Sequence, residues 1–150
     1  MSTAQTDSTK SASRATGSCL CGAVRYRLDG PLRKVVYCHC EQCRKTSGHF
    51  VAATAVDHDK LHITEDAGLS WYQSSDIARR GFCKTCGSSL FWAPSHGKYM
   101  AVMAGALDAP TGLSSREHIH TDDASDYYEI SDGLPQFGQE HADLWEDNDA

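Results

Sequence analysis

The chain has 150 residues, which suffices for one domain with a hydrophobic core. With 40% hydrophobic and 23% charged residues, its composition is that of an ordinary globular protein. The formal net charge of −6 argues against nucleic acid as a partner, because binding along a phosphate backbone requires clustered Lys and Arg. Residues 1–18 contain no apolar run, so we expect no secretory signal, no membrane span and a cytoplasmic location.

The two ends of the chain differ in composition from the middle. Residues 1–16 are rich in Ser, Thr and Ala, and we expect them to form a disordered tail. Residues 138–150 form a second, acidic tail. Nothing between the tails has the composition of a linker, so we expect residues 17–137 to fold as one domain.

Between the tails, short apolar segments alternate with turns, many of them marked by glycine. Residues 23–28 place Val24, Tyr26 and Leu28 on one face of an expected strand. Further strands are expected at 35–37, 50–56, 61–64, 69–72, 90–92, 99–103 and 117–120. The only early helix expected is a short turn over 41–46, ended by Gly48. This pattern favours a mainly β fold of short antiparallel strands.

The seven cysteines fall into three groups: Cys19 and Cys21, then Cys38, Cys40 and Cys43, then Cys83 and Cys86. In a chain without export, an odd number of cysteines at such short spacings indicates metal or redox chemistry rather than disulfides. A structural zinc site has four protein ligands, whereas a catalytic zinc commonly has three and an open position. If each group stays intact, only the outer two groups add up to four ligands, and the middle group remains as a set of three.

The outer pairs have the features of one structural zinc site. Cys83 and Cys86 are followed by Gly87, whose backbone freedom lets N–H groups turn toward the sulfurs. Cys19 and Cys21 lie two residues apart, so an extended segment directs both sulfurs to the same side. One ion would then clamp the first strand to a late hairpin and stabilise folding. The alternative is a set of buried reduced cysteines or a redox pair.

The middle group offers three thiolates to a metal and has no fourth cysteine. Its fourth ligand would be water, a substrate thiol or one of the histidines His49, His118 and His120, while His39 is expected to point away. Soft thiolate ligands favour a further thiolate as the exchangeable ligand. A metal there would also deprotonate a bound thiol at neutral pH. The group therefore predicts chemistry on a small thiol rather than hydrolysis by a metal-bound water.

Three cysteine-containing segments carry a resemblance to a known family, namely GSCLCGAVRY at 17–26, CHCEQCRK at 38–45 and GFCKTCGSSL at 81–90. Shorter matches follow at 106–108, 118–119 and 130–137. Over roughly residues 17–137 the chain resembles the glutathione-dependent formaldehyde-activating family, which shares its fold with centromere protein V. All seven cysteines keep the spacing and order of that family.

The resemblance implies a β-tent fold, in which short antiparallel sheets surround a structural zinc. It further implies two zinc ions per chain, the second more readily lost: a structural one at Cys19, Cys21, Cys83 and Cys86, and a catalytic one at Cys38, Cys40 and Cys43. The implied activity is of the carbon–sulfur lyase type. A small thiol such as glutathione would condense with formaldehyde or another aldehyde, or the adduct would be cleaved.

Two alternatives to this enzyme use the same residues. One is a non-catalytic, zinc-stabilised binding module of the centromere protein V type, whose partners favour a basic tail that this chain lacks. The other is a zinc-stabilised scaffold whose middle group has lost activity. Basic residues that could bind the carboxylates of glutathione, or be plain surface charges, are Arg44, Lys45, Arg79 and Arg80.

Overall fold

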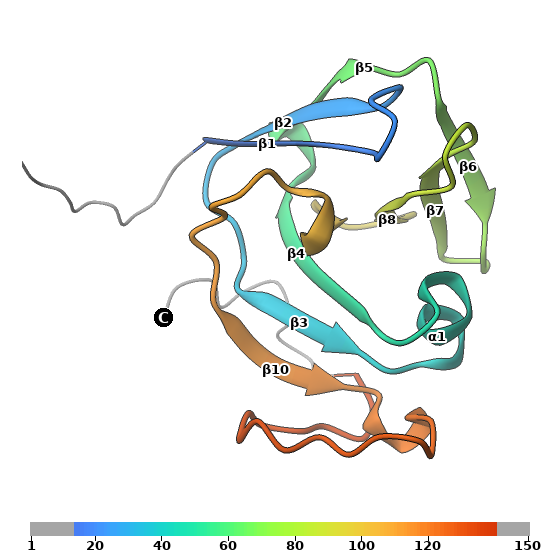
Figure 1. Ribbon diagram of the computed structural model, residues 1–150, viewed down its shortest axis with the longest axis vertical. Coiled ribbons are helices and arrows are strands. Elements are labelled where there is room, and N and C mark those ends of the chain that lie inside the picture. Colours follow the sequence, from blue (N-terminus) through green and yellow to red (C-terminus); the bar gives the residue numbers. More distant parts are fainter. Residues whose placement is uncertain (1–13, 141–150) are drawn as a thin grey trace, which may run out of the picture.

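The computed structural model describes residues 14–140, whose strands form two sheets (Figure 1). The smaller sheet has the order β1-β2-β5, and its strands are β1 Arg14–Ser18, β2 Arg25–Asp29 and β5 Leu61–Glu65. Both strand pairs in this sheet are antiparallel. The mainly β fold expected from the sequence is confirmed.

The larger sheet has seven strands in the order β10-β3-β4-β9-β8-β7-β6. Its strands are β3 Val35–Cys38, β4 Val51–Asp57, β6 Leu69–Gln73, β7 Ala78–Cys83, β8 Ser89–Pro94, β9 Tyr99–Met103 and β10 Ser115–Ile119. β10 pairs with β3 in parallel, whereas the other neighbours are antiparallel. The sheet is therefore mixed at this edge, which differs from the expected antiparallel sheets. A long connection after β9 brings the chain back to this edge, so β10 is not restricted to the antiparallel direction of a hairpin.

The described part of the chain has one α-helix, α1 Glu41–Ser47. It begins after Cys40, which acts as the N-cap, and it ends at Gly48 in the left-handed conformation with φ 89°. This confirms the expected short helix and its stop signal. Three single turns of 3₁₀-helix are also present: η2 His58–Lys60, η3 Ala104–Ala106 and η4 Thr121–Asp123. None of the helices in residues 14–140 is long and apolar enough to cross a membrane.

All the strands expected from the sequence are present, and β1 and β7 were not expected. β1 begins at Arg14, so the last residues of the expected N-terminal tail belong to a strand. They do so because Gly17 lets β1 lie close to Tyr26 and to the backbone of Ala106, whose carbonyl oxygen would be 2.7 Å from a Cβ at Gly17. The rest of that tail, 1–13, and residues 141–150 of the expected acidic tail lie outside the described residues.

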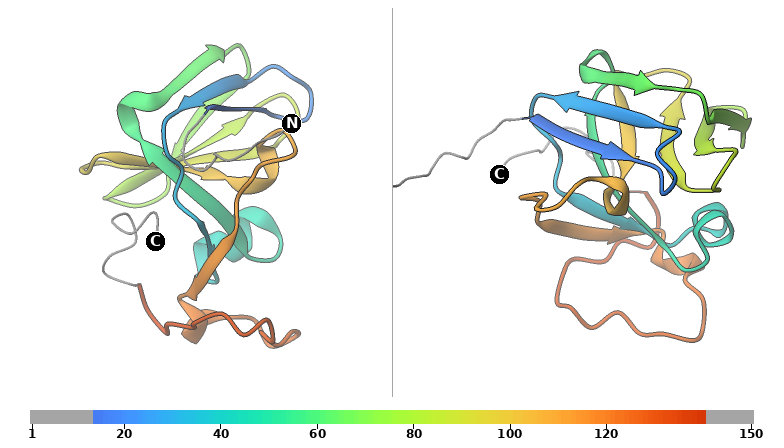
Figure 2. Two further views of the ribbon diagram at one scale, coloured as in Figure 1. Left: turned by 90° about the vertical axis from the view of Figure 1, so that its left-hand side faces the viewer. Right: turned by 45° about the horizontal axis from the view of Figure 1, so that its top comes forward.

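The hydrophobic core lies where the two sheets meet. Tyr26 and Leu28 of β2 pack in one cluster with Phe91 of β8 and Val102 of β9, and all four side chains are fully buried. The rings of Tyr26 and Phe91 meet edge to face, with centroids 5.0 Å apart. In Figure 2 the smaller sheet lies toward one end of the molecule, while β10, β3 and α1 lie toward the other. The middle group of three cysteines is thereby separated from the two outer pairs.

Candidate metal centres

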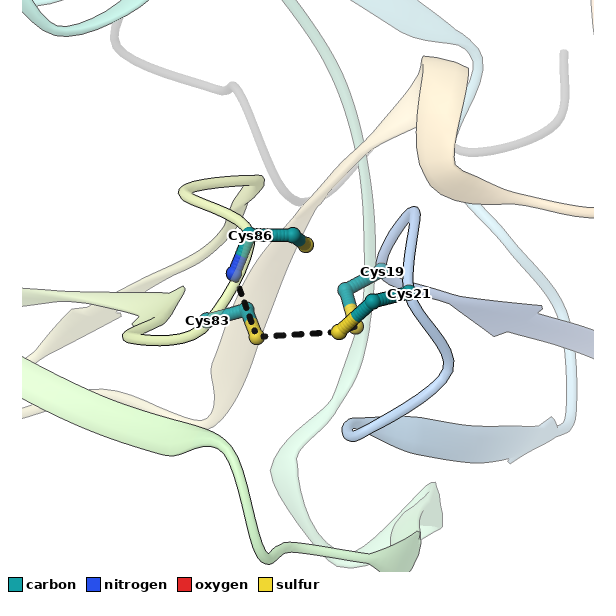
Figure 3. Close-up of side chains that lie close together, drawn as sticks. All are labelled: Cys19, Cys21, Cys83 and Cys86. Atoms are coloured by element: carbon teal, nitrogen blue, oxygen red, sulfur yellow. Dashed lines mark hydrogen bonds between the residues drawn. The ribbon is translucent and has the colours of Figure 1, made fainter.

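The two outer cysteine pairs meet in what we call the four-cysteine cluster, formed by Cys19, Cys21, Cys83 and Cys86 (Figure 3). Their sulfurs all lie within 4.8 Å of one another. The Sγ of Cys21 is 3.7 Å from that of Cys19 and 3.8 Å from that of Cys83. Four sulfurs placed tetrahedrally at the usual Zn–S distance of about 2.3 Å would be separated by about 3.8 Å. Both the donor atoms and their spacing therefore fit a zinc ion.

Polar groups around the late pair are turned toward its sulfurs. The backbone nitrogens of Thr85 and Cys86 lie 3.3 and 3.4 Å from the Sγ of Cys83. Gly87, at φ 84°, closes the turn with a 2.8 Å hydrogen bond from its N–H to the carbonyl of Cys83. The hydroxyl of Ser88, 3.2 Å from the Sγ of Cys86, lowers the pKa of that thiol to about 5. These donors stabilise thiolates, the form in which cysteine binds a metal.

The middle group forms the three-cysteine cluster of Cys38, Cys40 and Cys43, whose sulfurs also lie within 4.8 Å of one another. Cys38 is the last residue of β3, Cys40 is the N-cap of α1, and Cys43 lies in the first turn of α1. The Sγ of Cys40 accepts a hydrogen bond from the backbone N–H of Cys43 at 3.4 Å. Hydrogen bonds from the thiols of Cys38 and Cys43 hold the pKa of Cys40 well below its usual range. These hydrogen bonds favour the thiolate form of Cys40, the form in which cysteine binds a metal.

Arg80 is the charged neighbour of the three-cysteine cluster. It lies on β7 with only 7% of its surface exposed, and its Nη1 and Nη2 are 3.9 and 3.8 Å from the Sγ of Cys43. Nη2 also donates to the Oε1 of Gln42 at 3.2 Å. The buried Nε has no hydrogen-bond partner among residues 14–140. The guanidinium offsets the negative charge that gathers when several thiolates lie together.

A pocket of about 320 Å³ opens beside the three-cysteine cluster, and all three cysteines line it. Most of the exposed wall is apolar, and its side chains include Val51 of β4, Trp92 of β8 and Met103 of β9. Arg33 also lies on this wall, where burial lowers its pKa to about 10. A reactant bound at the cluster would thus be surrounded mainly by hydrocarbon.

None of the histidines considered as a fourth ligand belongs to the group of clustered sulfurs. Within residues 14–140, no histidine nitrogen belongs to either cysteine cluster. His118 is buried in β10, and the Nδ1 of His49 is 2.6 Å from the hydroxyl of Tyr127. His120 lines the pocket beside the cysteines, in the left-handed conformation with φ 56°. The described residues thus offer three protein ligands here.

His39, between two of the clustered cysteines, belongs to a chain of hydrogen bonds. Its Nε2 lies 2.9 Å from the Nδ1 of His118, and its Nδ1 contacts the hydroxyl of Tyr128. The Nε2 of His118 lies 2.8 Å from the Oδ2 of Asp132. Burial, with a contribution from His118, lowers the pKa of His39 to about 4, so this ring is neutral at pH 7. The carboxylate of Asp132 can only accept, so the Nε2 of His118 donates to it, and a neutral His39 that accepts from the hydroxyl of Tyr128 donates from Nε2 to the Nδ1 of His118.

Comparison with known proteins agrees with these cysteine clusters. The model of the family described as glutathione-dependent formaldehyde-activating enzyme matches residues 14–123, which include all seven cysteines. The chain belongs to this family. The resemblance recognised in the sequence is therefore confirmed.

Members of the formaldehyde-activating family and related proteins resemble the chain over most of its length. An "uncharacterized lyase" of Schizosaccharomyces pombe is 30% identical over 123 residues, which are 81% of this chain and 88% of the relative. A "putative glutathione-dependent formaldehyde-activating enzyme" of Halomonas elongata is 31% identical over 124 residues, 76% of this chain and 79% of the relative. A crystal structure of a Rhodobacter sphaeroides protein matches with a TM-score of 0.52 at 20% identity, covering 81% of this chain and 98% of that one. The last similarity concerns the fold alone.

The sequence left the role of Arg80 open and did not single out Gln42 or Asp132 as partners of other side chains. The role of Arg80 would have followed from recognising β7 as a strand. In β7, Ala78 and Arg80 are buried on one face, while Arg79 is exposed. The Cζ of Arg79 lies 4.0 Å from the centre of the Trp71 ring. Of the neighbouring residues Arg79 and Arg80, only Arg80 therefore contacts the three-cysteine cluster.

Proposed function

We propose that the protein is a zinc-dependent enzyme of the carbon–sulfur lyase type, which condenses a small thiol with an aldehyde or cleaves the adduct. The observation that carries this proposal is the three-cysteine cluster, which opens into a pocket and has no fourth protein ligand among residues 14–140. The family and the names of two relatives support a formaldehyde-activating or lyase role.

Both clusters have the donors that zinc prefers, and we assign them different roles. The four-cysteine cluster would hold a structural ion, because four thiolates leave no open position. The three-cysteine cluster would hold a catalytic ion, which supplies a lowered pKa for the substrate thiol. The apolar wall keeps water away from the reacting sulfur and leaves the thiol as the preferred fourth ligand.

In the condensation, the thiol sulfur forms a bond to the aldehyde carbon while the carbonyl π bond breaks. The electron pair moves to the aldehyde oxygen, and the proton released by the thiol ends on that oxygen. Arg80 lies on the pocket wall next to Cys43, where its N–H groups can stabilise the negative charge that develops on the oxygen. His120, on the same wall, is the side chain that we propose to pass the proton.

Metal content and turnover, measured on the same samples, test this proposal. We expect two zinc ions per chain in the wild type and one in Cys43→Ser. In NMR exchange experiments, only the wild type should accelerate the formation of adduct from thiols and aldehydes. One zinc in both proteins, or equal rates with and without the Cys43 thiol, would contradict the proposal.

A further inference from the structure

The pocket beside the three-cysteine cluster is larger than its simplest reactant needs. Its volume of about 320 Å³ lies within the range of about 300–1,000 Å³ that is usual for ligand pockets. Formaldehyde has one carbon and one oxygen and would leave most of that space empty. A largely apolar pocket of this size is the kind that binds an organic group.

The walls of the pocket are suited to hydrocarbon. Val51 and Ala53 of β4 and Ala101 of β9 are buried and pack with Cys43, while Trp92 and Met103 pack against the same group. All five of these side chains line the pocket. An apolar group that enters the pocket would therefore contact apolar atoms immediately beside the reacting sulfur.

The cations on the wall are already engaged by the protein. Arg33 donates from Nε to the carbonyl of Lys34 at 3.2 Å and from Nη2 to the carbonyl of Ala53 at 2.9 Å. Arg80 is directed to Gln42 and to the sulfur of Cys43, and its Nε, which has no partner among residues 14–140, is the donor left for the developing oxyanion. Glutathione carries two carboxylates and an ammonium group, and burying these charges without partners is costly. The two arginines of the pocket therefore offer little further bonding to the carboxylates of glutathione.

We infer that the preferred substrate pair carries an aliphatic or aromatic substituent, on the thiol or on the aldehyde, which fills this pocket. The inference rests on the proposed function and narrows its substrate class. The bond changes stay those of the condensation: a carbon–sulfur bond forms, the carbonyl π bond opens, and the thiol proton moves to oxygen. What changes is that burial of the substituent helps to hold the reactants in place.

A comparison of four substrate pairs tests the inference on the wild-type protein loaded with zinc. Glutathione or benzyl mercaptan is combined with formaldehyde or hexanal, and the catalysed rate is measured by NMR exchange. Each buried methylene should raise kcat/KM about fourfold until the pocket is full. The pairs in which only the thiol or only the aldehyde is apolar show which reactant carries the substituent. A preference for glutathione with formaldehyde over every apolar pair would overturn the inference.

A pair of matched variants separates the pocket from the rest of the site. Ala53→Leu adds bulk to the pocket wall, whereas Ala52→Leu adds the same bulk at the neighbouring position, which does not line the pocket. Ala53→Leu should reduce kcat/KM for the best apolar pair at least tenfold more than for glutathione with formaldehyde. Ala52→Leu should leave that ratio unchanged. Equal effects of Ala53→Leu on all pairs would overturn the inference.

Binding without turnover gives an independent readout. Addition of 1-hexanol should shift the NMR signals of the Trp92 indole and the Met103 methyl in the wild type, and much less in Ala53→Leu. Failure of the proposed function looks different: wild type and Cys43→Ser would then show the same rates with every pair. If Cys43 is required but apolar pairs are not preferred and 1-hexanol does not bind, the function stands and the inference fails.

Discussion

The Nε2 of His39 lies 2.9 Å from the Nδ1 of His118. This hydrogen bond connects the loop between Cys38 and Cys40 to β10, the strand that pairs in parallel with β3. The far side of His118 is bound in turn to Asp132. The position of the cysteine loop is thus set by His118 and Asp132, which lie 79 and 93 positions after His39 in the chain.

Replacement of Asp132 should change how stability depends on pH. The hydrogen bond from His118 holds the pKa of Asp132 below its usual range. A carboxylate of this kind stabilises the folded state above its unfolded pKa, about 3.9, and the contribution disappears as pH falls through the lower folded pKa. The difference in unfolding free energy between wild type and Asp132→Asn should therefore be constant near neutral pH and shrink below about pH 4.

Urea unfolding followed by circular dichroism at several pH values measures this difference. Acid also protonates the cysteine ligands, but it does so in both proteins, so the comparison isolates Asp132. A difference that grows toward low pH would show that the hydrogen bond with His118 does not stabilise the ionised carboxylate.

Gly68 should not tolerate a side chain, because it lies between the two halves of the four-cysteine cluster. Its N–H donates to the carbonyl of Ala23 at 2.9 Å, and its carbonyl accepts from the N–H of Lys84 at 2.8 Å. A Cβ at this position would lie only 2.8 Å from the Sγ of Cys83. Gly68→Ala should therefore destabilise the protein by about 1–3 kcal/mol and weaken metal binding at this cluster.

Gly105→Ala is the matched control for this change, since a Cβ there meets nothing within 4 Å. Urea unfolding and a zinc competition titration should separate the two variants. If both lose the same stability and the same metal affinity, close packing around Gly68 is not the cause.

Arg80 should be required for turnover, whereas Arg79 should not. Replacement of one donor that stabilises a developing oxyanion costs about 10²–10³-fold in rate, and we expect a loss of this order in Arg80→Gln. Arg79→Gln removes a charge next to it in sequence, but from a side chain that lies over Trp71. Steady-state kinetics and zinc affinity should be measured on both variants. Comparable losses of activity in Arg80→Gln and Arg79→Gln would indicate a general effect of positive charge on this strand.

The two clusters should differ in their importance for folding. Structural zinc sites contribute about 10–16 kcal/mol of binding free energy, comparable with the whole stability of a domain at about 5–15 kcal/mol. Cys19 is buried in the main core, so Cys19→Ser should abolish the cooperative thermal transition. Cys38→Ser should keep that transition, because Cys38 packs at the edges of two smaller groups of buried residues. Melting curves that are the same for both variants would refute this distinction.

The sequence sufficed for most of the fold because local patterns specify it. The alternation around Val24 and the Gly48 stop signal each predicted an element that the structure contains. The parallel pairing of β10 with β3 could not be predicted in this way, because it depends on where a long connection returns the chain. β7 was missed since the sequence reasoning considered Arg79 and Arg80 only as ligands of glutathione or surface charges, although a strand places them on opposite faces.

For the candidate centres, cysteine spacing predicted the division into four and three, and the positions of the sulfurs agree with it. The pocket could not be predicted, because its wall combines residues from several strands, such as Val51 and Met103, whose sequences look like ordinary core. The burial of Arg80 beside Cys43 likewise arises only when β7 and α1 come together. Long-range packing, and not local sequence, shapes the surroundings of the cysteines.

The separation of the four clustered cysteines along the chain has a consequence for the order of folding. Cys21 and Cys83 lie 62 residues apart, yet their sulfurs come within 3.8 Å. Bringing such distant segments together costs loop-closure entropy and slows folding. The complete set of ligands exists only once the two sheets have docked. Metal capture at this cluster would therefore be a late step, one that locks a nearly finished domain rather than nucleating it.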